Sequence, residues 1–185
     1  RSTPRETLFP YTTLFRSSCG WINPKTLKND TTITNFKTTT NNGDAYIIYN
    51  DANNDEYYIL ENRQRTGWDK YLPDSGMLAM HIDYSRDAWE SNIVNNETAH
   101  HRISAIWVKD SLTANSVPAA DIYNKGKNGS NYLNMGINDV NANADNTINF
   151  MFRKYNFQEN EVVGDTLFHE SFDKCMGKGG NDNNW

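Results

Sequence analysis

The sequence predicts a mainly β fold built from antiparallel sheets, with few short helices. Short apolar runs recur along the body of the chain, and clusters of Asn, Asp and Gly separate them, as is typical of strands joined by turns. Aromatic residues make up 12% of the chain, which is enough for a real core despite the polar average. The formal net charge of −5 argues against nucleic acid and against an anionic membrane surface as partners. No apolar run is long enough to span a bilayer.

Five segments are predicted to be strands. The first lies between the turn-forming clusters 41–44 and 50–55, and a second apolar run follows at once, so the two are expected to form a hairpin. The alternation is clearest in the last strand, where every second residue is apolar. In order, the predicted strands are 45–49, 57–63, 77–84, 103–108 and 147–153. One or two turns of helix are expected within residues 87–95.

The chain is expected to divide after the last of these strands. Residues 154–165 are polar and lose periodicity, which predicts a linker, and residues 166–185 open a new strand-like unit that stops at Trp185. Cys19 and Cys175 lie far apart and form no zinc-ribbon or redox pattern. A disulfide between them and two separate buried thiols both remain open.

The first 17 residues are expected not to belong to the natural protein. Residues 8–17 can be back-translated into a common sequencing-library adapter, and residues 1–3 fit the upstream part of that adapter. We therefore exclude residues 1–17 from the predicted fold and expect the gene to have been cut on its 5′ side. The alternative is that residues 8–15 form a real strand, which would bury Leu8, Phe9 and Leu14.

No complete catalytic motif occurs in the sequence. The zinc-protease signature H-E-x-x-H is absent, because Ser, Phe and Asp follow His169 and Glu170. His100 and His101 are adjacent, so they do not share a face of a helix or strand and make a poor chelate. There is also no G-x-S-x-G elbow, Walker loop or dinucleotide-binding fingerprint. We therefore predict no catalytic residue and no metal ligand in this chain.

Four polar residues on two successive strands form the candidate site. Glu61 and Arg63 share a face of the strand 57–63, and His81 and Asp83 share a face of the strand 77–84. If the strands are neighbours, the four side chains could form one polar cluster on the sheet. Such a cluster could support a substrate site or could be a structural ion-pair network. The structural interpretation is favoured, because no nucleophile or metal site accompanies the four residues.

Two further patterns suggest ligands. Residues 51–56 and 138–145 are rich in side-chain oxygens, which would suit calcium, but neither segment matches a full EF-hand loop. Solvated hairpin turns are therefore the preferred interpretation. Trp68, Trp89 and Trp107 could form a sugar-stacking platform, although Trp107 lies in an apolar strand and is expected to pack in the core.

Several ordered motifs resemble the immune inhibitor A family of secreted bacterial zinc metallopeptidases. In that family an ENRQ…GWD…LP-x-x-G stretch leads into a WHID-like strand, and this chain carries YYILENRQ at 57–64, GWDKYLP at 67–73 and GMLAMHIDY at 76–84. Met80 stands where an aromatic residue often sits, and residues 74–75 are Asp-Ser where Gly-His is common. The likeness covers most of residues 19–152. It includes CGWINP at 19–24, which is similar to a GW-x-x-P segment of the family. It continues through Trp89, Asn92, residues 94–95 and Arg102, and a weaker match covers residues 148–152.

The resemblance implies that residues 18–153 are the downstream half of an α+β metallopeptidase domain. The zinc-binding helix of such a domain would lie upstream of Cys19, where zinc would polarise the peptide carbonyl and activate a water. The parent protein would then be a secreted or cell-surface endopeptidase that acts on a protein or peptide substrate. Glu61, Arg63, His81 and Asp83 would have only a supporting role, and this chain alone would be inactive.

Two other functions stay open on the sequence alone. The chain could be a non-catalytic extracellular β-sandwich module for adhesion or glycan binding, or an inactive peptidase homologue used for binding. Residues 166–185 resemble the opening of a C-terminal β-sandwich module found on secreted, surface-associated bacterial proteins. A H-E-x-x-H motif encoded upstream of Cys19 would support the peptidase, and a different module there would argue against it.

Overall fold

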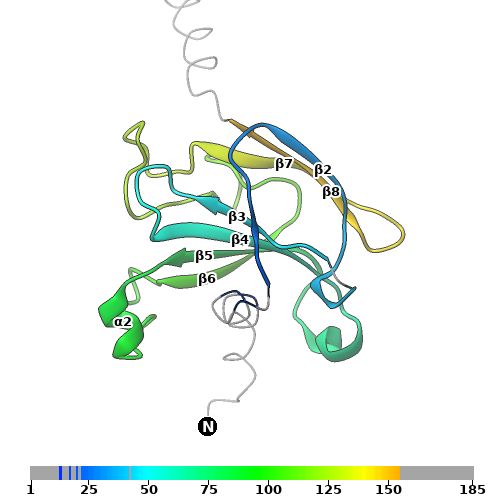
Figure 1. Cartoon of the computed structure of the whole chain (residues 1–185), viewed down its shortest axis with the longest axis horizontal. Coiled ribbons are helices and arrows are strands. Elements are labelled where there is room, and N and C mark those ends of the chain that lie inside the picture. Colours follow the sequence, from blue (N-terminus) through cyan, green and yellow to red (C-terminus); the bar gives the residue numbers. More distant parts are fainter. Residues whose placement is uncertain (1–12, 14–16, 18–19, 21, 42, 155–185) are drawn as a thin grey trace, which may run out of the picture. The chain divides into compact units, whose positions relative to one another are not determined.

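The computed structural model describes residues 13, 17, 20, 22–41 and 43–154, and this part of the chain is mainly β, as predicted. Two mostly antiparallel sheets lie one above the other as layers (Figure 1). The described helices are a single short α-helix and two short 3-10 helices. None of them is long and apolar enough to cross a membrane.

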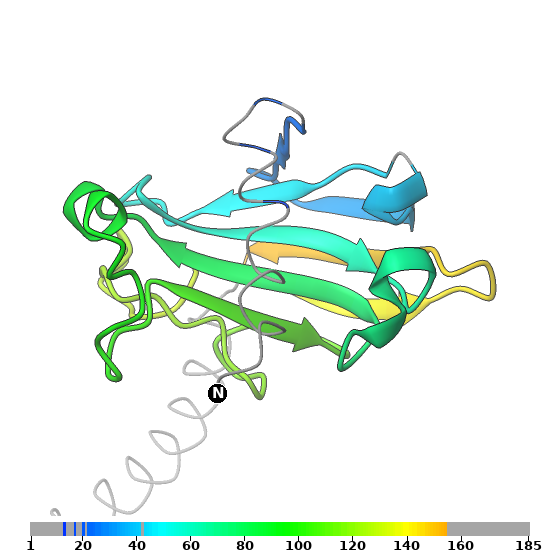
Figure 2. The ribbon, with the colours of Figure 1, turned by 90° about the horizontal axis from the view of Figure 1, so that it is seen from below.

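Sheet A has five strands, in the spatial order β1-β3-β4-β5-β6 (Figure 2). The short strand β1 runs parallel to β3, and every other neighbouring pair is antiparallel. Four of the five predicted strands lie in this sheet. Each of these four strands contains one of the apolar runs from which it was predicted. The strands are β1 (Lys25–Thr26), β3 (Tyr46–Tyr49), β4 (Glu56–Arg63), β5 (Gly76–Asp83) and β6 (Ile103–Val108).

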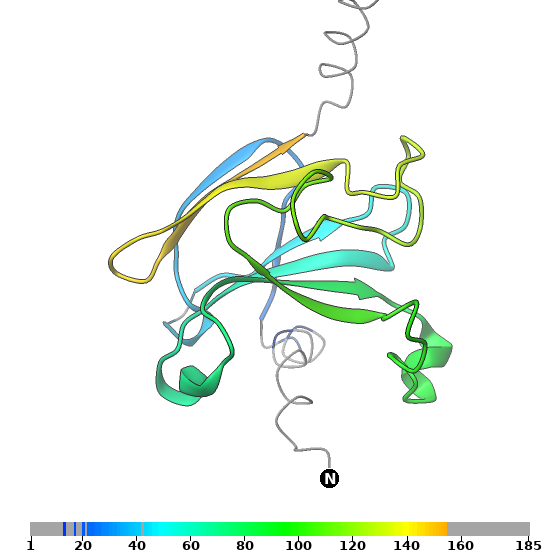
Figure 3. The ribbon, with the colours of Figure 1, turned by 180° about the vertical axis from the view of Figure 1, so that it is seen from behind.

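Sheet B has three antiparallel strands, β2 (Thr31–Phe36), β8 (Ile148–Lys154) and β7 (Met135–Ala142), in that spatial order (Figure 3). The fifth predicted strand is β8. The turn predicted at 138–145 is corrected, because its first part belongs to β7. A β-bulge between Asn138 and Asn141, with Asp139 at a φ of 54°, interrupts the alternation there and hides the strand in the sequence.

Short helices and one long loop connect the strands. The 3-10 helix η1 (Thr39–Asn41) follows β2, and η2 (Gly67–Tyr71) joins β4 to β5. The helix α2 (Arg86–Glu90) follows β5 and falls at the start of the predicted helical turns. Residues 109–134 then lead from sheet A to sheet B, and bridges such as Leu112–Ile137 attach this loop to β7.

The main hydrophobic core lies between the two sheets. Its centre is aromatic: the rings of Phe36, Tyr46 and Phe150 meet edge to face at centroid distances of 5.2–5.9 Å. These rings come from β2, β3 and β8, so they join both sheets. Buried aliphatic side chains such as Leu60, Ala79 and Ile137 complete the core.

The face of sheet A that points away from sheet B, here called the outer face, is also buried. It carries a second apolar cluster, formed by Ile47, Ile59, Leu78, Met80 and Ile82. On β5 all residues from Met77 to Asp83 are buried, so the side chains of both faces are covered. Sheet B differs, since burial alternates along β8 from Ile148 to Phe152. Sheet A therefore has the burial of an interior layer, and sheet B that of a surface layer.

Several predictions fall on residues that the structure does not describe. These are the linker predicted at 154–165 apart from Lys154, which ends β8, the module at 166–185, both cysteines, and the side chains of Leu8, Phe9 and Leu14. Thr13 is described, although it belongs to the segment expected to derive from an adapter. Its side chain is buried and its hydroxyl donates a hydrogen bond to Glu61 Oε2.

Candidate functional site

The structure does not bring Glu61, Arg63, His81 and Asp83 together. Strands β4 and β5 are neighbours, as expected, but their register pairs Glu61 with Leu78 and Tyr58 with His81. Because paired residues share a face, Glu61 lies on the outer face of sheet A and His81 on the face toward sheet B. The single polar cluster expected from the sequence is therefore replaced by two clusters on opposite faces.

The first cluster is centred on Glu56, at the beginning of β4. Its side chain is fully buried, and both carboxylate oxygens accept hydrogen bonds. Oε1 lies 2.9 Å from His81 Nε2 and 2.6 Å from the backbone nitrogen of Tyr123. Oε2 accepts from the Asn50 side chain at 2.9 Å and from the Asn124 backbone at 3.0 Å. Glu56 therefore ties β5 and the 109–134 loop to the start of β4.

Asp83 extends this cluster toward the surface. Its Oδ2 lies 2.7 Å from His100 Nε2 and 2.9 Å from Arg102 Nη1, and its Oδ1 accepts from the Asn124 side chain at 3.0 Å. Glu56 and Asp83 are directly paired across β4 and β5, and Asn124 bonds to both carboxylates. The two buried carboxylates therefore share one network of donors. We call Glu56, His81, Asp83, His100 and Asn124 the Glu56 cluster.

Aromatic rings stack in a column through the Glu56 cluster. The His81 ring lies 4.5 Å from the Tyr58 ring at an interplanar angle of 4°, and 5.4 Å from the Tyr123 ring on its other side. Tyr123 is in turn 3.8 Å from His100. Tyr58 also donates a hydrogen bond to the Asp121 carbonyl at 2.7 Å. The column and the hydrogen bonds hold the imidazole of His81 in one orientation, as a structural side chain requires.

The Glu56 cluster makes the free energy of unfolding of the domain depend on pH in the acidic range. Burial by itself would raise the pKa of Glu56, but hydrogen bonds from His81, Asn50 and the 123–124 amides lower it from 4.5 to about 2. The contribution of Glu56 to stability is therefore complete above pH 4.5, falls as the pH drops below that value, and is lost through pH 2. The difference corresponds to roughly 3 kcal/mol.

We expect the Glu56→Gln variant to lose this part of the acid dependence. Urea unfolding measured from pH 7 down to pH 2 should give a shallower decline for the variant than for the unchanged chain, since Gln does not titrate. The Glu97→Gln variant, changed at an exposed residue, should keep the original slope. Equal slopes for all three proteins would show that Glu56 is not the titrating group.

The second cluster lies on the outer face of sheet A. Glu61 Oε2 accepts from Arg63 Nε at 2.9 Å, and Arg63 Nη1 donates to Asp69 in η2 at 2.9 Å. Burial by itself would lower the pKa of Arg63, but the carboxylates of Glu61 and Asp69 raise it, so the guanidinium stays charged. Glu61 Oε1 is buried and accepts no hydrogen bond in the described structure. We call Glu61, Arg63 and Asp69 the Glu61 cluster.

The side chains of the ENRQ segment, residues 61–64, alternate between the two faces of β4 and make different contacts on each face. Glu61 and Arg63 point to the outer face, while Asn62 and Gln64 point toward sheet B. The Asn62 amide donates to the Phe36 carbonyl at 2.7 Å and to the Asn146 carbonyl at 2.8 Å, which attaches β4 to the end of sheet B where β2 ends and β8 begins. Gln64 Nε2 donates to Asn62 Oδ1 at 2.8 Å. The segment is thus a structural junction.

The residues after ENRQ close the β4–β5 connection. Arg65 Nε donates to the Leu72 carbonyl at 2.9 Å and its Nη2 donates to the Pro73 carbonyl, which folds the connection back on itself. Gly76 begins β5 at a φ of 118°, in the region that favours glycine. The motif G-W-D…L-P-x-x-G therefore describes one folded turn that presents Asp69 to Arg63.

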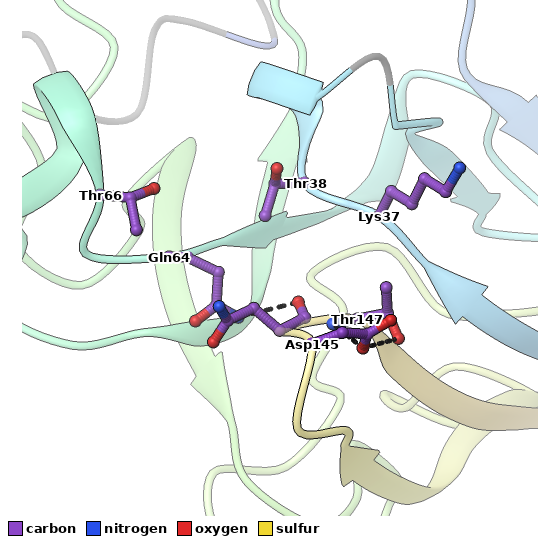
Figure 4. Close-up of a pocket in the computed structure, with 7 residues that line it drawn as sticks. Lys37, Thr38, Gln64, Thr66, Asp145 and Thr147 are labelled. Carbon is purple, nitrogen blue, oxygen red and sulfur yellow. Dashed lines mark hydrogen bonds between the residues drawn. The ribbon is translucent and has the colours of Figure 1, made fainter.

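A small polar pocket of about 330 Å³ lies next to this junction (Figure 4). Asp145 accepts hydrogen bonds from both the hydroxyl and the backbone nitrogen of Thr147, and these bonds lower its pKa. Gln64 Nε2 lies 3.5 Å from the Asn146 carbonyl. Asp145, Thr147 and Gln64 are thus used in hydrogen bonds within the fold. Its lining is Lys37, Thr38, Gln64, Thr66, Asp145, Asn146 and Thr147.

The oxygen-rich segment at 51–56 and the preceding Asn50 use side-chain oxygens to accept hydrogen bonds from backbone nitrogens. Asn50 Oδ1 accepts from the Ala52 backbone at 3.0 Å, and Asn53 Oδ1 accepts from the Asp55 backbone at 3.1 Å. Asp51 binds the backbone nitrogen of Lys127 at 2.8 Å. Such side-chain to backbone bonds are those of turns, the interpretation preferred from the sequence. Calcium binding stays a prediction without support from this geometry.

Of the three tryptophans considered for a sugar platform, two pack on the outer face of sheet A. Trp89 and Trp107 lie against the outer apolar cluster, and Trp89 is 5.0 Å from the Tyr84 ring. The side chain of Trp68 lies outside the described structure. Trp107 therefore helps to cover a core, as its place in an apolar strand suggested.

Most of the Glu56 cluster was missed in the sequence. Glu56 was assigned to the turn at 51–56, although it is the first residue of β4. A strand that begins at Glu56 would have placed this carboxylate on the same face of β4 as Tyr58, the face that His81 shares in the observed register. His100 and Asn124 carry no such signal, because loops bring them to the site. His101 is exposed and takes no part, and His169 and Glu170 lie outside the described residues.

The arrangement supports structure rather than catalysis. Glu56 already accepts hydrogen bonds on both oxygens, so it has little capacity left to act as a general base. Within the described residues, no three His, Cys, Asp or Glu side chains gather as a metal site would require. Comparisons with protein-family models, with curated proteins and with solved structures give no match for this chain.

Proposed function

We propose that residues 22–154 are the β-rich part of a secreted zinc-dependent endopeptidase domain that resembles immune inhibitor A and acts on protein or peptide substrates. The observation that carries the proposal is the apolar character of both faces of sheet A, with Leu60 and Ala79 toward sheet B and Leu78, Met80 and Ile82 on the outer face. In this proposal, the outer face receives the zinc-carrying part of the same domain. The described residues provide the supporting sheet and are not catalytic by themselves.

A two-layer β-sandwich has no reason to bury the outer face of a sheet. Antiparallel sheets with one solvated face alternate apolar and polar residues, as β8 does. Sheet A instead places Leu78, Met80 and Ile82 on its outer face, each of them fully buried. A sheet that is apolar on both sides belongs in the middle of three layers, which is the arrangement of an α+β domain. A free-standing adhesion or glycan-binding sandwich does not call for this third layer.

The Glu61 cluster supports the same arrangement. A buried ion pair stabilises a protein only when its remaining hydrogen-bonding groups are satisfied. Glu61 is fully buried, but its Oε1 has no partner among the residues that the structure describes. An atom of this kind is expected where another layer brings a donor. Thr13 donates to Glu61 Oε2, and in this proposal the rest of the peptidase domain brings the donor that Glu61 Oε1 lacks.

Zinc does not fit the described residues. His81 and His100 are both engaged by carboxylates, and neither belongs to a group of three ligating side chains in the part of the chain that the structure covers. Any zinc of the parent protein would be held by residues outside this part. The Glu56 cluster then has a positioning role, because it fixes the 109–134 loop against sheet A.

We expect residues 18–185 alone to show no zinc-dependent proteolysis. The measurement is hydrolysis of a fluorescently labelled casein with added Zn²⁺, with and without a chelator. Chelator-sensitive hydrolysis by these residues would contradict the proposal, because it would place a zinc site in this chain. A different module encoded directly upstream of Cys19, in place of H-E-x-x-H, would favour a binding function instead.

A further inference from the structure

A groove opens at the edge of sheet A where β1 ends. The Leu27 nitrogen donates to the Ile47 carbonyl at 2.9 Å, and the chain then leaves sheet A to begin β2 at Thr31. Strand β3 continues to Tyr49, so its last residues extend beyond β1. The groove has a volume of about 890 Å³. Its apolar lining consists of Leu27, Ile48, Leu133, Met135 and Phe152, of which only Met135 is partly exposed and the other four belong to the main core.

Among the described residues, the edge of β3 in this groove has no strand partner beyond Ile47. Ala45 and Ile47 turn their carbonyls toward β1, where they accept hydrogen bonds at 2.8 and 2.9 Å. Backbone groups alternate in direction along a strand, so Tyr49 also turns its N–H and C=O to this side. In the described structure β1 pairs only with Tyr46 and Ile47, which leaves Tyr49 available. One further extended chain could add to the sheet there.

The rim of the groove is positively charged on an acidic protein. Lys28, Lys127 and Lys154 line it, and all three are exposed. None of these ammonium groups forms an ion pair with a described residue. The acidic residue of the lining, Asp51, is already bonded to the backbone of Lys127 and lies 3.4 Å from the Asn134 amide. The whole chain has a net charge of −5, so this concentration of lysines runs against its average.

We propose that the groove binds an extended peptide segment in which acidic and apolar residues alternate. The peptide backbone pairs with Tyr49, its apolar side chains face the Tyr49 ring and Met135, and its carboxylates approach the three lysines. An acidic polysaccharide would satisfy the lysines but would use neither the strand edge nor the apolar floor. The groove lies on the side of sheet A that faces sheet B, so this function does not depend on the proposed peptidase.

The test uses the full chain and a fluorescein-labelled hexapeptide of alternating glutamate and valine. Fluorescence anisotropy should show saturable binding that weakens as salt is added, because the lysines are exposed. The variant Lys127→Glu should raise the Kd by roughly three- to tenfold. The matched control Lys70→Glu changes an exposed lysine of η2, outside the groove, and should leave the Kd unchanged. If Lys127→Glu does not fold, Lys28→Glu replaces it.

Two further probes separate this peptide mode from simple attraction between charges. A hexapeptide with N-methylated backbone amides keeps its carboxylates but cannot pair with a strand, so it should bind clearly more weakly. Heparin at matched charge should compete only weakly, because it can bind the lysines but cannot pair with Tyr49; competition as strong as that of the unlabelled hexapeptide overturns the proposal. The proposal is overturned if the N-methylated peptide binds equally well, if Lys70→Glu weakens binding as much as Lys127→Glu, or if no saturable binding is found.

Discussion

The Glu56→Ala variant should lose about 3–5 kcal/mol of unfolding free energy, the range expected when one partner of a buried charged network is removed. Five donor groups point at this carboxylate, from His81, Asn50, Tyr123 and Asn124, and Ala satisfies none of them. The loss is a large part of the total stability of a domain of this size. Urea unfolding at pH 7 measures it.

Two matched variants decide whether the network causes this loss. Glu56→Gln keeps the volume and one acceptor oxygen, so it should cost less than Glu56→Ala, about 1–3 kcal/mol. Glu97→Ala removes an exposed glutamate and should change the free energy of unfolding by less than about 0.5 kcal/mol. A Glu56→Ala protein as stable as Glu97→Ala would mean that the cluster contributes little.

The Met80→Asp variant should be destabilised by about 4 kcal/mol or more, and the Met151→Asp variant by less than about 1 kcal/mol. Both methionines lie in the middle of a strand, and both variants introduce the same charge. Met80 is fully buried in the outer apolar cluster of sheet A. Met151 is only half-buried, on the face of sheet B that points away from the core, between Thr32 and Asn138.

The difference in stability between the two variants reports whether the outer face of sheet A is covered more fully than the outer face of sheet B. An outer face that served only as surface would accept a charge at Met80 as readily as at Met151. Thermal melts and urea unfolding of the two proteins give the comparison directly, and Met80→Leu provides a control that keeps the apolar volume and should cost under about 1.5 kcal/mol. Equal, small losses for the two Asp variants would refute the interior position of sheet A.

Strands β3 to β6 of sheet A could be predicted because their apolar runs are short and sharply bounded. Strands β2 and β7 could not, since they lie in a sheet with one exposed face and contain Thr, Asn and Asp residues that the sequence assigns to turns. The bulges in both strands also break the alternation that would mark them. Burial on two faces gives a stronger sequence signal than burial on one.

The candidate site was predicted only in part, for a reason of register. Glu61, Arg63, His81 and Asp83 were correctly assigned to neighbouring strands, but the face of one strand relative to the next depends on which residues pair. A shift of one residue reverses that face. The β4–β5 register places Glu61 opposite Leu78, and the 109–134 loop, whose path has no local signal, completes the cluster around His81.

The most direct measurement for the proposed function is proteolysis by the chain extended upstream with its natural gene sequence. We expect this longer protein to bind zinc and to hydrolyse labelled casein, with loss of activity in chelator and recovery on addition of Zn²⁺, while residues 18–185 stay inactive. A longer protein that folds, binds no zinc and leaves casein intact would contradict the proposal.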